Sequence, residues 1–418
     1  MKIKELYSIF KKNPVICTDS REITKGSIFI SLKGENFDGN KYALEAIKKG
    51  CSYAIIDDKK HKRNTKTILV DDCLKTLQEL ATYHRKKLNL PIIGITGTNG
   101  KTTSKELIYN VLKSKLKTYA TKGNLNNHIG VPLSILEIKQ NHDIAIIEMG
   151  ANHQNEIYLL CKIAQPNYGI ITNIGSAHLE GFKNLAGVIK TKNELYEYIS
   201  TNKGQLFVNN QDDLLLKLAK GISQSNYGEK GKTHISNKKN SPFINIKYKN
   251  QLIKSNLIGD YQFYNIMLSI CIGEYFKIPL EDIKKSIEKY IPKNNRSEVI
   301  NTKKNKIILD AYNANPSSVL AMLKSFAKYK TKNKVCIIGD MLELGNHSKQ
   351  EHEKITKLCV KLNLNTFFIG NEFKKINRNA YKTKQMFIEY LKNEPIKNKT
   401  ILVKGSRGLY LEKLIKYL

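Results

Sequence analysis

The residues with the clearest chemical potential are two glycines, a lysine and a threonine in the stretch 94–103, which reads GITGTNGKTT. This stretch follows an apolar run that predicts a buried strand, and it leads into a predicted helix. Gly97 and Gly100 let backbone N–H groups approach an anion closely, and the helix N-terminus adds partial positive charge. Lys101 can reach the outer phosphates of a nucleotide, and the hydroxyl of Thr102 can coordinate Mg²⁺. The stretch therefore predicts a phosphate-binding loop, called the phosphate loop below.

The phosphate loop departs from the standard P-loop pattern, which requires a glycine five residues before the glycine of the Gly-Lys pair. Here that position is Ile95. The alternative interpretation is a tight strand-to-helix turn with an incidental lysine. We favour phosphate binding because the strand, the paired glycines, Lys101 and two consecutive threonines occur in the order that the mechanism requires.

From Pro91 onwards predicted strands and helices alternate, which indicates a mostly parallel sheet with its binding crevice at the carboxyl ends of the strands. Glu148 directly follows a buried strand, where a Mg²⁺ ligand of a P-loop protein belongs; the alternative is a carboxylate that caps the turn at Gly150. His178 lies six residues after the next strand and is expected on the same rim, although a lone histidine is more often structural. Lys192 looks by composition like one more surface lysine, and an ammonium group has no lone pair to give a metal.

The pattern weakens after residue 204, where the polar run 223–240 predicts a loop and a hairpin. Residues 293–418 again alternate between strands and helices, and they end in a predicted helix over 408–417. Three polar segments follow strands of this second doubly wound unit, at 310–316, 339–345 and 404–408. Because the binding crevice of such a unit lies at the carboxyl ends of its strands, we expect all three segments on one binding face. Because they contain no second phosphate loop, we expect this unit to carry a co-substrate and to supplement the nucleotide site.

These patterns predict an α/β protein of three domains, since 418 residues exceed one ordinary core. Residues 1–88 form a small mixed α/β domain, residues 89–292 a central P-loop doubly wound sheet, and residues 293–418 a C-terminal Rossmann-like α/β domain. The first domain carries a polar cluster that includes Ser20 and Arg21. The cluster could bind a ligand or simply make turns.

The formal charge of +33 invites a nucleic-acid interpretation. However, lysines occur on every segment, singly or in pairs, and no arginine-rich tract interleaved with stacking aromatics is present. We therefore expect no specific nucleic-acid partner, although a P-loop protein that binds nucleic acid through its charge stays an alternative. Seven scattered cysteines without a C-x-x-C pair argue against disulfides and structural zinc. Neither a secretory signal nor a membrane-spanning apolar run occurs, so we expect a soluble, cytoplasmic protein.

Motifs along nearly the whole chain resemble the Mur ligase family. They are TDSR at 18–21, GITGTNGKTT at 94–103, GNLNNHIGVPL at 123–133, EMGAN at 148–152, TNIGSAHLE at 172–180, NRSE at 295–298, DAYNANP at 310–316, GDMLELG at 339–345 and KGSRG at 404–408. The GTNGKT core is shared with folylpolyglutamate synthetases. The GNLNN, DAYNANP and GDMLELG runs resemble the branch that joins D-alanyl-D-alanine to UDP-N-acetylmuramoyl-tripeptide.

The resemblance implies an ATP-dependent amide ligation in peptidoglycan precursor synthesis. The tripeptide carboxylate attacks the γ-phosphate of ATP to form an acyl phosphate, and the amine of the dipeptide then displaces phosphate. The resemblance assigns the UDP-sugar to the first domain, ATP to the second and the dipeptide to the third, in a chain that we expect to be a monomer. Two neighbouring alternatives keep the fold and change the substrate, namely a tripeptide-forming Mur ligase and a folylpolyglutamate synthetase.

The resemblance also assigns roles to individual residues. The catalytic residues it implies are Lys101, Lys192, His178 and Arg296. The nucleotide contacts are Gly97, Thr98, Asn99, Gly100, Lys101, Thr102, Thr103, Asn265, Arg296 and Asp310. The substrate contacts are Ser20, Arg21, Asn124, Asn126, Asn127, Asn313 and Asn315. Two Mg²⁺ ions would be held by Thr102, Glu148, His178 and a carbamylated Lys192, because a carbamate has the anionic oxygens that an ammonium lacks.

Overall fold

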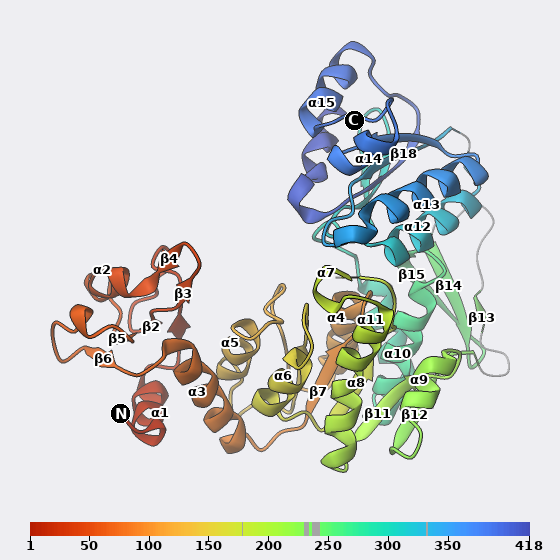
Figure 1. The fold of residues 1–418 in the computed structure, drawn as a ribbon. Helices are drawn as coiled ribbons and strands as arrows, with labels where there is room; N and C mark the ends of the chain where they lie inside the picture. The colour runs from red at the N-terminus through yellow and green to blue at the C-terminus, as the bar shows by residue number, and fades with distance from the viewer. Residues whose placement is uncertain (178, 230–233, 236–242, 332) are drawn as a thin grey trace.

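The computed structural model describes residues 1–177, 179–229, 234–235, 243–331 and 333–418. The chain forms three lobes, and each is built around a sheet of its own. In Figure 1 the N-terminal lobe lies to one side of the central lobe, and the C-terminal lobe lies above the central lobe. His178, one of the predicted site residues, lies outside the described residues.

The N-terminal lobe contains a parallel sheet of four short strands in the order β1-β2-β5-β6. Its strands are β1 (Ile16–Cys17), β2 (Ile28–Ile30), β5 (Tyr53–Ile56) and β6 (Thr67–Leu69), its small hairpin is β3 (Lys33–Gly34) and β4 (Phe37–Asp38), and its helices are α1 (Ile3–Lys12), α2 (Ala43–Lys48) and α3 (Cys73–Lys87). Helix α3 packs on α1 and also on helices α5 and α6 of the central lobe. One hydrophobic core therefore continues from the first lobe into the second.

The central lobe is built on a six-stranded, all-parallel sheet in the order β12-β11-β10-β7-β9-β8. Its strands are β7 (Ile92–Thr96), β8 (Thr118–Ala120), β9 (Ile144–Glu148), β10 (Tyr168–Ile171), β11 (Gln205–Asn209) and β12 (Gln224–Tyr227). Successive residues of β7 and β9 enter opposite cores: Ile92 packs into one and Ile93 into the other. Burial on both faces explains the continuous apolar runs in the sequence.

Helices cover both faces of the central sheet. One core contains side chains of α4 (Lys101–Leu112), α10 (Gln262–Tyr275) and α11 (Leu280–Lys289). The other contains side chains of α5 (Gly130–Leu136), α6 (Glu156–Ala164), α7 (Leu179–Phe182), α8 (Leu185–Thr201) and α9 (Asp213–Leu218). This arrangement leaves the carboxyl ends of the strands as the free edge at which a site can form.

The loop and hairpin predicted over 223–240 are wrong for residues 224–227, and the parts of the prediction at 230–233 and 236–240 lie outside the described residues. Residues 224–227 form β12, a strand parallel to β11 at the edge of the central sheet. Its polar residues are at least partly exposed and only Tyr227 is buried, so it lacks the apolar signal of an inner strand. A separate antiparallel sheet follows, made of β13 (His234–Ile235), β14 (Phe243–Tyr248) and β15 (Gln251–Ile258).

The C-terminal lobe has five strands in the order β16-β17-β20-β18-β19, of which only β16 is antiparallel to its neighbour. The strands are β16 (Glu298–Asn301), β17 (Lys306–Asp310), β18 (Lys334–Gly339), β19 (Asn365–Ile369) and β20 (Thr400–Lys404), and the helices are α12 (Pro316–Lys328), α13 (Ser348–Lys361), α14 (Asn371–Ile376) and α15 (Lys384–Asn393). The α-helix predicted over 408–417 is wrong. Two 3₁₀ segments, Arg407–Leu409 and Leu411–Tyr417, stand there because Tyr410 adopts a left-handed conformation with φ of 51°.

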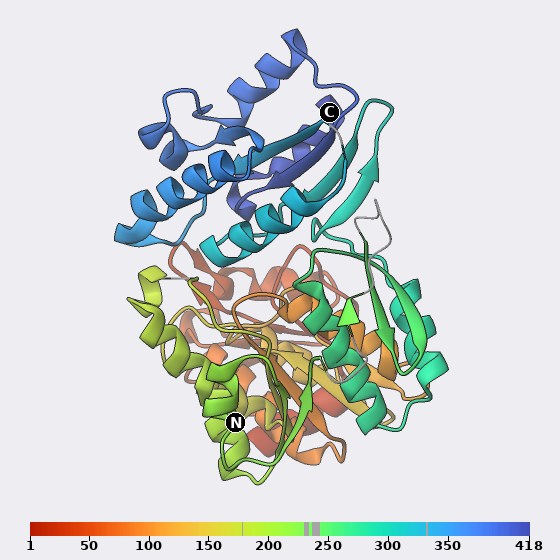
Figure 2. The same ribbon diagram turned by 90° about the vertical axis from the view of Figure 1, so that its right-hand side faces the viewer.

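The central and C-terminal lobes face each other across a cavity of about 1130 Å³, called the central cavity below. It is lined by the carboxyl ends of β7, β9 and β10 on one side and of β17 and β20 on the other. Figure 2 shows the C-terminal lobe standing above the central lobe. The described residues of the N-terminal lobe do not line this cavity.

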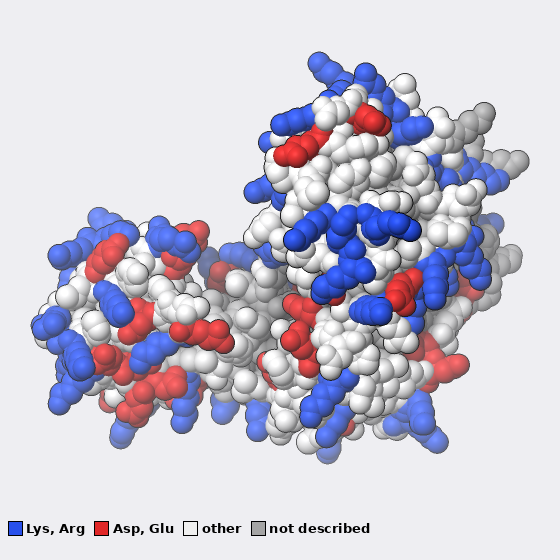
Figure 3. Space-filling model, turned by 45° about the horizontal axis from the view of Figure 1, so that its top comes forward, with Lys and Arg blue, Asp and Glu red and all other residues white. Residues whose placement is uncertain are grey.

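Lysine and arginine side chains are scattered over the surface. On the face drawn in Figure 3 they lie on every lobe, interspersed with acidic side chains. Among the described helices, none combines the length and the apolar character that a membrane span requires.

Candidate active site

The phosphate loop has the backbone geometry of an anion cradle. Gly97 and Gly100 have φ of 137° and 81°, and Gly100 caps the N-terminus of α4. A Cβ atom on Gly97 would lie 2.0 Å from Oγ1 of Thr172, and one on Gly100 would lie 2.9 Å from Oδ1 of Asn265. Both positions therefore require glycine for conformation and for space.

Hydrogen bonds from the end of β10 hold the phosphate loop in place. Thr98 N donates to the carbonyl of Asn173 at 2.9 Å, and Asn99 N donates to Oδ1 of Asn173 at 3.0 Å. The hydroxyl of Thr172 and the side-chain amide of Asn173 both donate to the carbonyl of Asn99. Asn173 was not among the predicted site residues, although its position directly after a strand of the sheet marks this edge.

Lys101 folds back over the phosphate loop. Its Nζ donates to the carbonyls of Gly97 at 2.6 Å and Thr98 at 3.1 Å. Burial lowers the pKa of Lys101, Glu148 opposes this shift, and Arg296 adds to it. The ammonium group thus stands over the loop, where it can neutralise a phosphate.

Glu148 lies beneath the phosphate loop and is 1% exposed. Its Oε1 accepts hydrogen bonds from Thr102 Oγ1 at 3.2 Å and from Asn126 Nδ2 at 2.9 Å, and its Oε2 lies 3.3 Å from Nζ of Lys105. Burial would raise the pKa of Glu148, but Lys105 and then Lys101 lower it below its usual value. The carboxylate is therefore anionic at neutral pH.

The donor set around Glu148 fits a Mg²⁺ ion. The carboxylate and the Thr102 hydroxyl offer adjacent oxygens, which is the chemistry that Mg²⁺ prefers. Oε2 of Glu148 is buried and lies 3.3 Å from Nζ of Lys105, but it accepts no hydrogen bond among the described residues. It therefore keeps a lone pair that a metal ion could use.

Lys105 is a site residue that the sequence interpretation missed. It is 3% exposed, and its Nζ also donates to the carbonyl of Gly123 at 3.2 Å. A helical spacing of four residues places Lys105 on the same face of α4 as Lys101. This four-residue spacing in the sequence could have indicated that Lys105 belongs to the site.

Lys192 lines the central cavity from α8 and is 3% exposed. Burial and the charge of Lys101 lower the pKa of Lys192 to about 7, while Glu194 and Glu156 act against this shift. Its Nζ lies 5.6 Å from the centroid of the Phe182 ring, and no described residue forms a salt bridge or hydrogen bond with it. Burial therefore favours the uncharged amine of Lys192 at a much lower pH than for an exposed lysine.

Some of the predicted site residues form hydrogen bonds with other groups of the protein. Asn265 is buried below Gly100, accepts a hydrogen bond from Ser104 Oγ at 3.0 Å and donates to Gln262 Oε1 at 2.6 Å. Asn127 Oδ1 accepts hydrogen bonds from two backbone N–H groups at the start of α5. These two residues, together with Asn124 and Thr103, line the central cavity.

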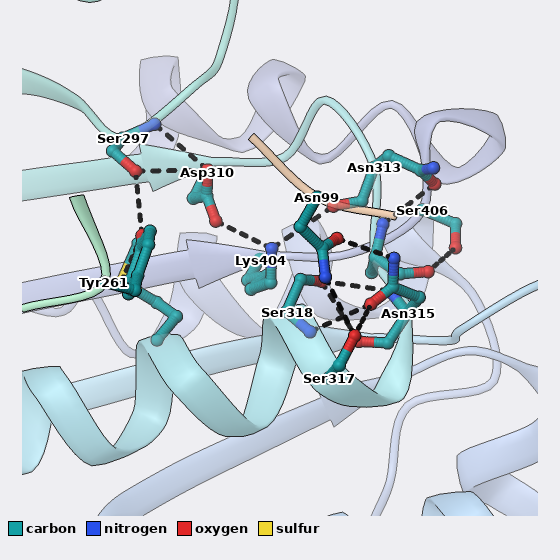
Figure 4. A network of polar contacts seen from close by, with 12 residues as sticks. Asn99, Tyr261, Ser297, Asp310, Asn313, Asn315, Ser317, Ser318, Lys404 and Ser406 are labelled. Atoms are coloured by element: carbon teal, nitrogen blue, oxygen red, sulfur yellow. Dashed lines mark hydrogen bonds and ion pairs between the residues drawn. The ribbon is translucent and has the colours of Figure 1, made fainter. Parts of the chain in front are cut away.

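The C-terminal lobe contributes a partly buried ion pair at the opposite wall. Nζ of Lys404 lies 2.6 Å from Oδ2 of Asp310 and donates to the carbonyl of Asn313 at 3.2 Å. Oδ1 of Asp310 accepts hydrogen bonds from the backbone N–H and the hydroxyl of Ser297. Figure 4 shows this network beside the phosphate loop. Both carboxylate oxygens of Asp310 thus have partners within the lobe.

Among the contacts between the central and C-terminal lobes are hydrogen bonds of three polar side chains, Asn99, Asn315 and Ser317, which we call the Asn99 bridge. Nδ2 of Asn315 donates to Oδ1 of Asn99 at 2.8 Å, and Nδ2 of Asn99 donates to Oγ of Ser317 at 2.8 Å. Asn315 also caps α12 through a hydrogen bond from Ser318 N (Figure 4). The phosphate loop is therefore connected directly to the N-terminus of a helix in the other lobe.

Four further predicted residues differ in their relation to the cavity. Arg296 lines it, with its guanidinium 3.6 Å from the centroid of the Tyr312 ring, and exposed Asn313 also lines it. Ser20 and Arg21 do not, because they belong to the N-terminal lobe. The exposed Arg21 is paired with Asp19 of the same turn.

Comparison with protein families accounts for all three lobes. The family model described as Mur ligase family, catalytic domain, matches residues 15–85; the Mur ligase middle domain matches 95–273; and the Mur ligase, glutamate ligase domain, matches 295–407. A UDP-N-acetylmuramoyl-tripeptide–D-alanyl-D-alanine ligase of Bacillus subtilis is 32% identical, with 96% of this chain and 92% of the relative covered. The chain belongs to the Mur ligase family. The resemblance inferred from the sequence is thereby confirmed.

A second relative supports the same family assignment. An enzyme of the same name from Haemophilus influenzae is 32% identical over 96% of this Mur ligase and 92% of the relative.

Solved structures share the three-domain Mur ligase fold. MurF from Acinetobacter baumannii superposes with a TM-score of 0.87 at 29% identity, covering 99% of this chain and 98% of that one. MurF from Thermotoga maritima in complex with ADP has a TM-score of 0.84 at 26% identity, with 97% of each chain covered. The α/β fold of three domains expected from the sequence is confirmed.

Proposed function

We propose that this Mur ligase joins D-alanyl-D-alanine to UDP-N-acetylmuramoyl-tripeptide and converts ATP to ADP and phosphate, as a cytoplasmic step of peptidoglycan precursor synthesis. The observation that carries the proposal is a full-length likeness, at 32% identity, to relatives of that name. An FPGS complex with AMPPCP and folate has only 14% identity and a TM-score of 0.61, which concerns the fold alone. The dipeptide ligase is therefore preferred over a folylpolyglutamate synthetase.

The reaction needs positive charge because a carboxylate must attack a phosphate. A carboxylate oxygen of the tripeptide forms a bond to the γ-phosphorus, and ADP leaves. The amine of the dipeptide then forms a bond to the acyl carbon, phosphate leaves, and the amine loses a proton. Lys101, Arg296 and the backbone N–H groups of the phosphate loop line one cavity and can stabilise the transferring phosphoryl group by position and charge.

Thr102 and Glu148 would hold one Mg²⁺ ion, and His178 together with a modified Lys192 a second. Bound Mg²⁺ supplies positive charge to the phosphate oxygens. The fit of the first pair is supported by the contact between the Thr102 hydroxyl and Oε1 of Glu148, and by the buried Oε2, which accepts no hydrogen bond among the described residues. Asn126 holds the other oxygen of Glu148 and so fixes the carboxylate plane.

Carbamylation of Lys192 is part of the proposal. The uncharged amine forms a bond to the carbon of CO₂ and loses a proton, which yields an anionic carbamate. Burial and the low pKa of Lys192 support this reaction, because only the uncharged amine has the lone pair that it needs. We expect a ¹³C-labelled carbamate resonance in the wild type and none in Lys192→Ala. We also expect a short carboxylic acid to restore part of the ligation activity of that variant. An active variant without rescue would contradict the role.

The N-terminal lobe would bind the UDP-sugar through residues that include Ser20 and Arg21, with the chain as a monomer. Five asparagines would contact the two peptide substrates, namely Asn124, Asn126, Asn127, Asn313 and Asn315. Since Ser20 and Arg21 lie away from the central cavity, we propose that the lobes close around the substrates before phosphoryl transfer, which also excludes water.

The decisive test is a phosphate-release assay with omitted components. Phosphate release is expected only when ATP, Mg²⁺, UDP-N-acetylmuramoyl-tripeptide and D-alanyl-D-alanine are all present. Release with a single amino acid in place of the dipeptide would favour a tripeptide-forming ligase. Release that responds to DNA or RNA, and not to the dipeptide, would contradict the proposal.

A further inference from the structure

One arginine in the central cavity has no role in the chemistry described so far. Arg407 follows β20 in the C-terminal lobe, is exposed, and lines the cavity. Its Nη1 donates to the hydroxyl of Tyr312 at 3.3 Å, and its guanidinium carbon lies 5.2 Å from the centroid of that ring. Arg296 contacts the same ring. Two guanidinium groups therefore converge on one tyrosine.

Neither guanidinium has an acidic partner among the residues that the structure describes. Lys404, which lines the same cavity, differs because it pairs with Asp310. Like charges that gather without a counter-ion repel each other, and the repulsion is relieved when an anion binds. This part of the cavity is therefore suited to an anionic ligand.

The segment that carries Arg407 is held firmly. The backbone N–H of Ser406 donates to the carbonyl of Asp340 at 3.1 Å, and Oγ of Ser406 accepts a hydrogen bond from Leu342 N at 3.0 Å. Lys404, at the end of β20, is 2% exposed. The backbone before Arg407 is therefore fixed, and the hydrogen bond to Tyr312 restrains the guanidinium itself, which favours recognition of a small ligand.

The two arginines have different surroundings. Arg296 acts electrostatically on both Lys101 and Glu148, so it faces the phosphate loop. Arg407 follows β20 and lines the cavity from the C-terminal lobe, as Asn313 does. Arg296 is therefore assigned to the phosphate, and Arg407 is available for a different anion on the wall formed by the C-terminal lobe.

We propose that Arg407 binds the terminal carboxylate of the dipeptide substrate and orients its amine toward the acyl carbon. This inference rests on the proposed ligase function. A guanidinium can donate two parallel hydrogen bonds to a carboxylate, which fixes direction as well as position. Tyr312 holds the guanidinium from one side, and is a positioning residue in this arrangement.

The test combines a change in the protein with a change in the substrate. Wild-type enzyme and Arg407→Gln are assayed with D-alanyl-D-alanine and with its C-terminal carboxamide. The wild type is expected to show a KM about 10- to 100-fold higher for the carboxamide, because a charge-assisted hydrogen bond is lost. Arg407→Gln is expected to show a similarly high KM for both substrates, with the KM for ATP and for the UDP-linked substrate nearly unchanged.

Controls separate folding, charge and function. Arg378→Gln removes another exposed arginine of the same lobe and is expected to behave as the wild type. Arg407→Lys keeps the charge without the paired donors and is expected to retain part of the preference for the carboxylate. Thermal unfolding of each variant shows whether the fold is intact.

The outcomes are distinguishable. A variant Arg407→Gln that still prefers the carboxylate over the carboxamide overturns the inference, and so does a rise in the KM for ATP that equals the rise for the dipeptide. Wild-type enzyme that fails to use the dipeptide at all would instead contradict the proposed function.

Discussion

Nζ of Lys105 lies 3.3 Å from Oε2 of Glu148, and both side chains are buried under the phosphate loop. This pair matters because Glu148 is also bound by Thr102 and Asn126, two residues of the predicted site. Lys105 therefore keeps a buried carboxylate ionised and fixed at the place where the nucleotide and its metal would bind. A buried charge that loses its partner is costly, which makes the pair testable.

Replacement of Lys105 by methionine should lower the free energy of unfolding by about 3 kcal/mol, because Glu148 is left charged and unpaired. The pKa of Glu148 is lowered mainly by Lys105 against the effect of burial, so it should rise in the variant. A lowered carboxyl pKa stabilises the fold above the unfolded-state value and ceases to do so as the pH falls. The difference between variant and wild type should thus be larger at about pH 8 than at about pH 4 in urea unfolding.

The matched control for this prediction is Lys115→Met. Lys115 pairs with Asp282 at 3.1 Å on the surface, with its side chain 53% exposed. Exposed pairs contribute about 0 to 1 kcal/mol, so little change is expected. Equal effects of the two substitutions would remove the special role of the buried pair.

Replacement of Gly97 by alanine should strongly weaken nucleotide binding. The new Cβ would stand 2.0 Å from Oγ1 of Thr172, whose hydroxyl donates to Asn99, and the φ of 137° is unfavourable for alanine. ADP affinity measured by calorimetry should fall by about 100-fold or more, since about 3 kcal/mol of contacts and strain is involved. Gly221→Ala is the control, because φ is 80° there but no atom lies within 4 Å of the added Cβ. Tight ADP binding by Gly97→Ala would contradict the assignment of the loop.

Replacement of Lys192 by methionine should stabilise the fold while it removes ligation. The folded-state pKa of Lys192 is about 7, well below the ordinary value of a lysine, so the unfolded chain binds more protons between the two values. The destabilisation of the fold by the buried ammonium group is therefore fully present below about pH 7, and it disappears as the pH rises toward about 10.5. In CO₂-free buffer near pH 6.5 we expect a gain of about 1 to 3 kcal/mol in unfolding free energy.

Lys190→Met is the matched control, since Lys190 lies exposed on the same helix. It should change neither stability nor ligation appreciably. A destabilised Lys192→Met protein would show that the ammonium is paired in the folded state.

The sequence was sufficient for the inner sheet strands because they are buried on both faces. Residues 92–96 supply alternate side chains to two cores, and that requirement leaves an unmistakable apolar run. Residues 224–227 and 298–301 are edge strands that need no such run, so their pairing depends on distant neighbours. The predicted helix over 408–417 failed because Tyr410, a left-handed residue, carries no glycine-like signal.

The site was predictable where chemistry and backbone geometry coincide and unpredictable where partners are distant in sequence. The glycines of the phosphate loop can be recognised in the sequence, because few other residues tolerate their backbone conformation. Lys105, however, is one lysine among many, and its partner Glu148 lies 43 residues further along the chain. The contact of Asn126 with Glu148 could not be predicted for the same reason, since only the fold brings the two side chains together.

The Asn99 bridge predicts that a single donor group affects how the central and C-terminal lobes sit together. Asn315→Asp keeps the oxygen that caps α12 but exchanges the amide donor for a second oxygen, which then faces Oδ1 of Asn99. Because aspartate caps helices as well as asparagine does, the unfolding free energy should change by less than about 0.5 kcal/mol. The lobes should nevertheless separate more easily, which small-angle scattering would detect as a larger radius of gyration without nucleotide.

Asn184→Asp provides the control for this prediction. Asn184 caps α8 through a hydrogen bond from Gly187 N at 3.0 Å and is not part of the Asn99 bridge. The same chemical change there should leave the scattering profile as in the wild type. Asn99→Ala removes both hydrogen bonds of the bridge and should enlarge the radius of gyration at least as much as Asn315→Asp. If neither variant altered the profile, other contacts between the lobes, such as the pair of Lys328 and Asp260 at 2.9 Å, would be sufficient to hold them.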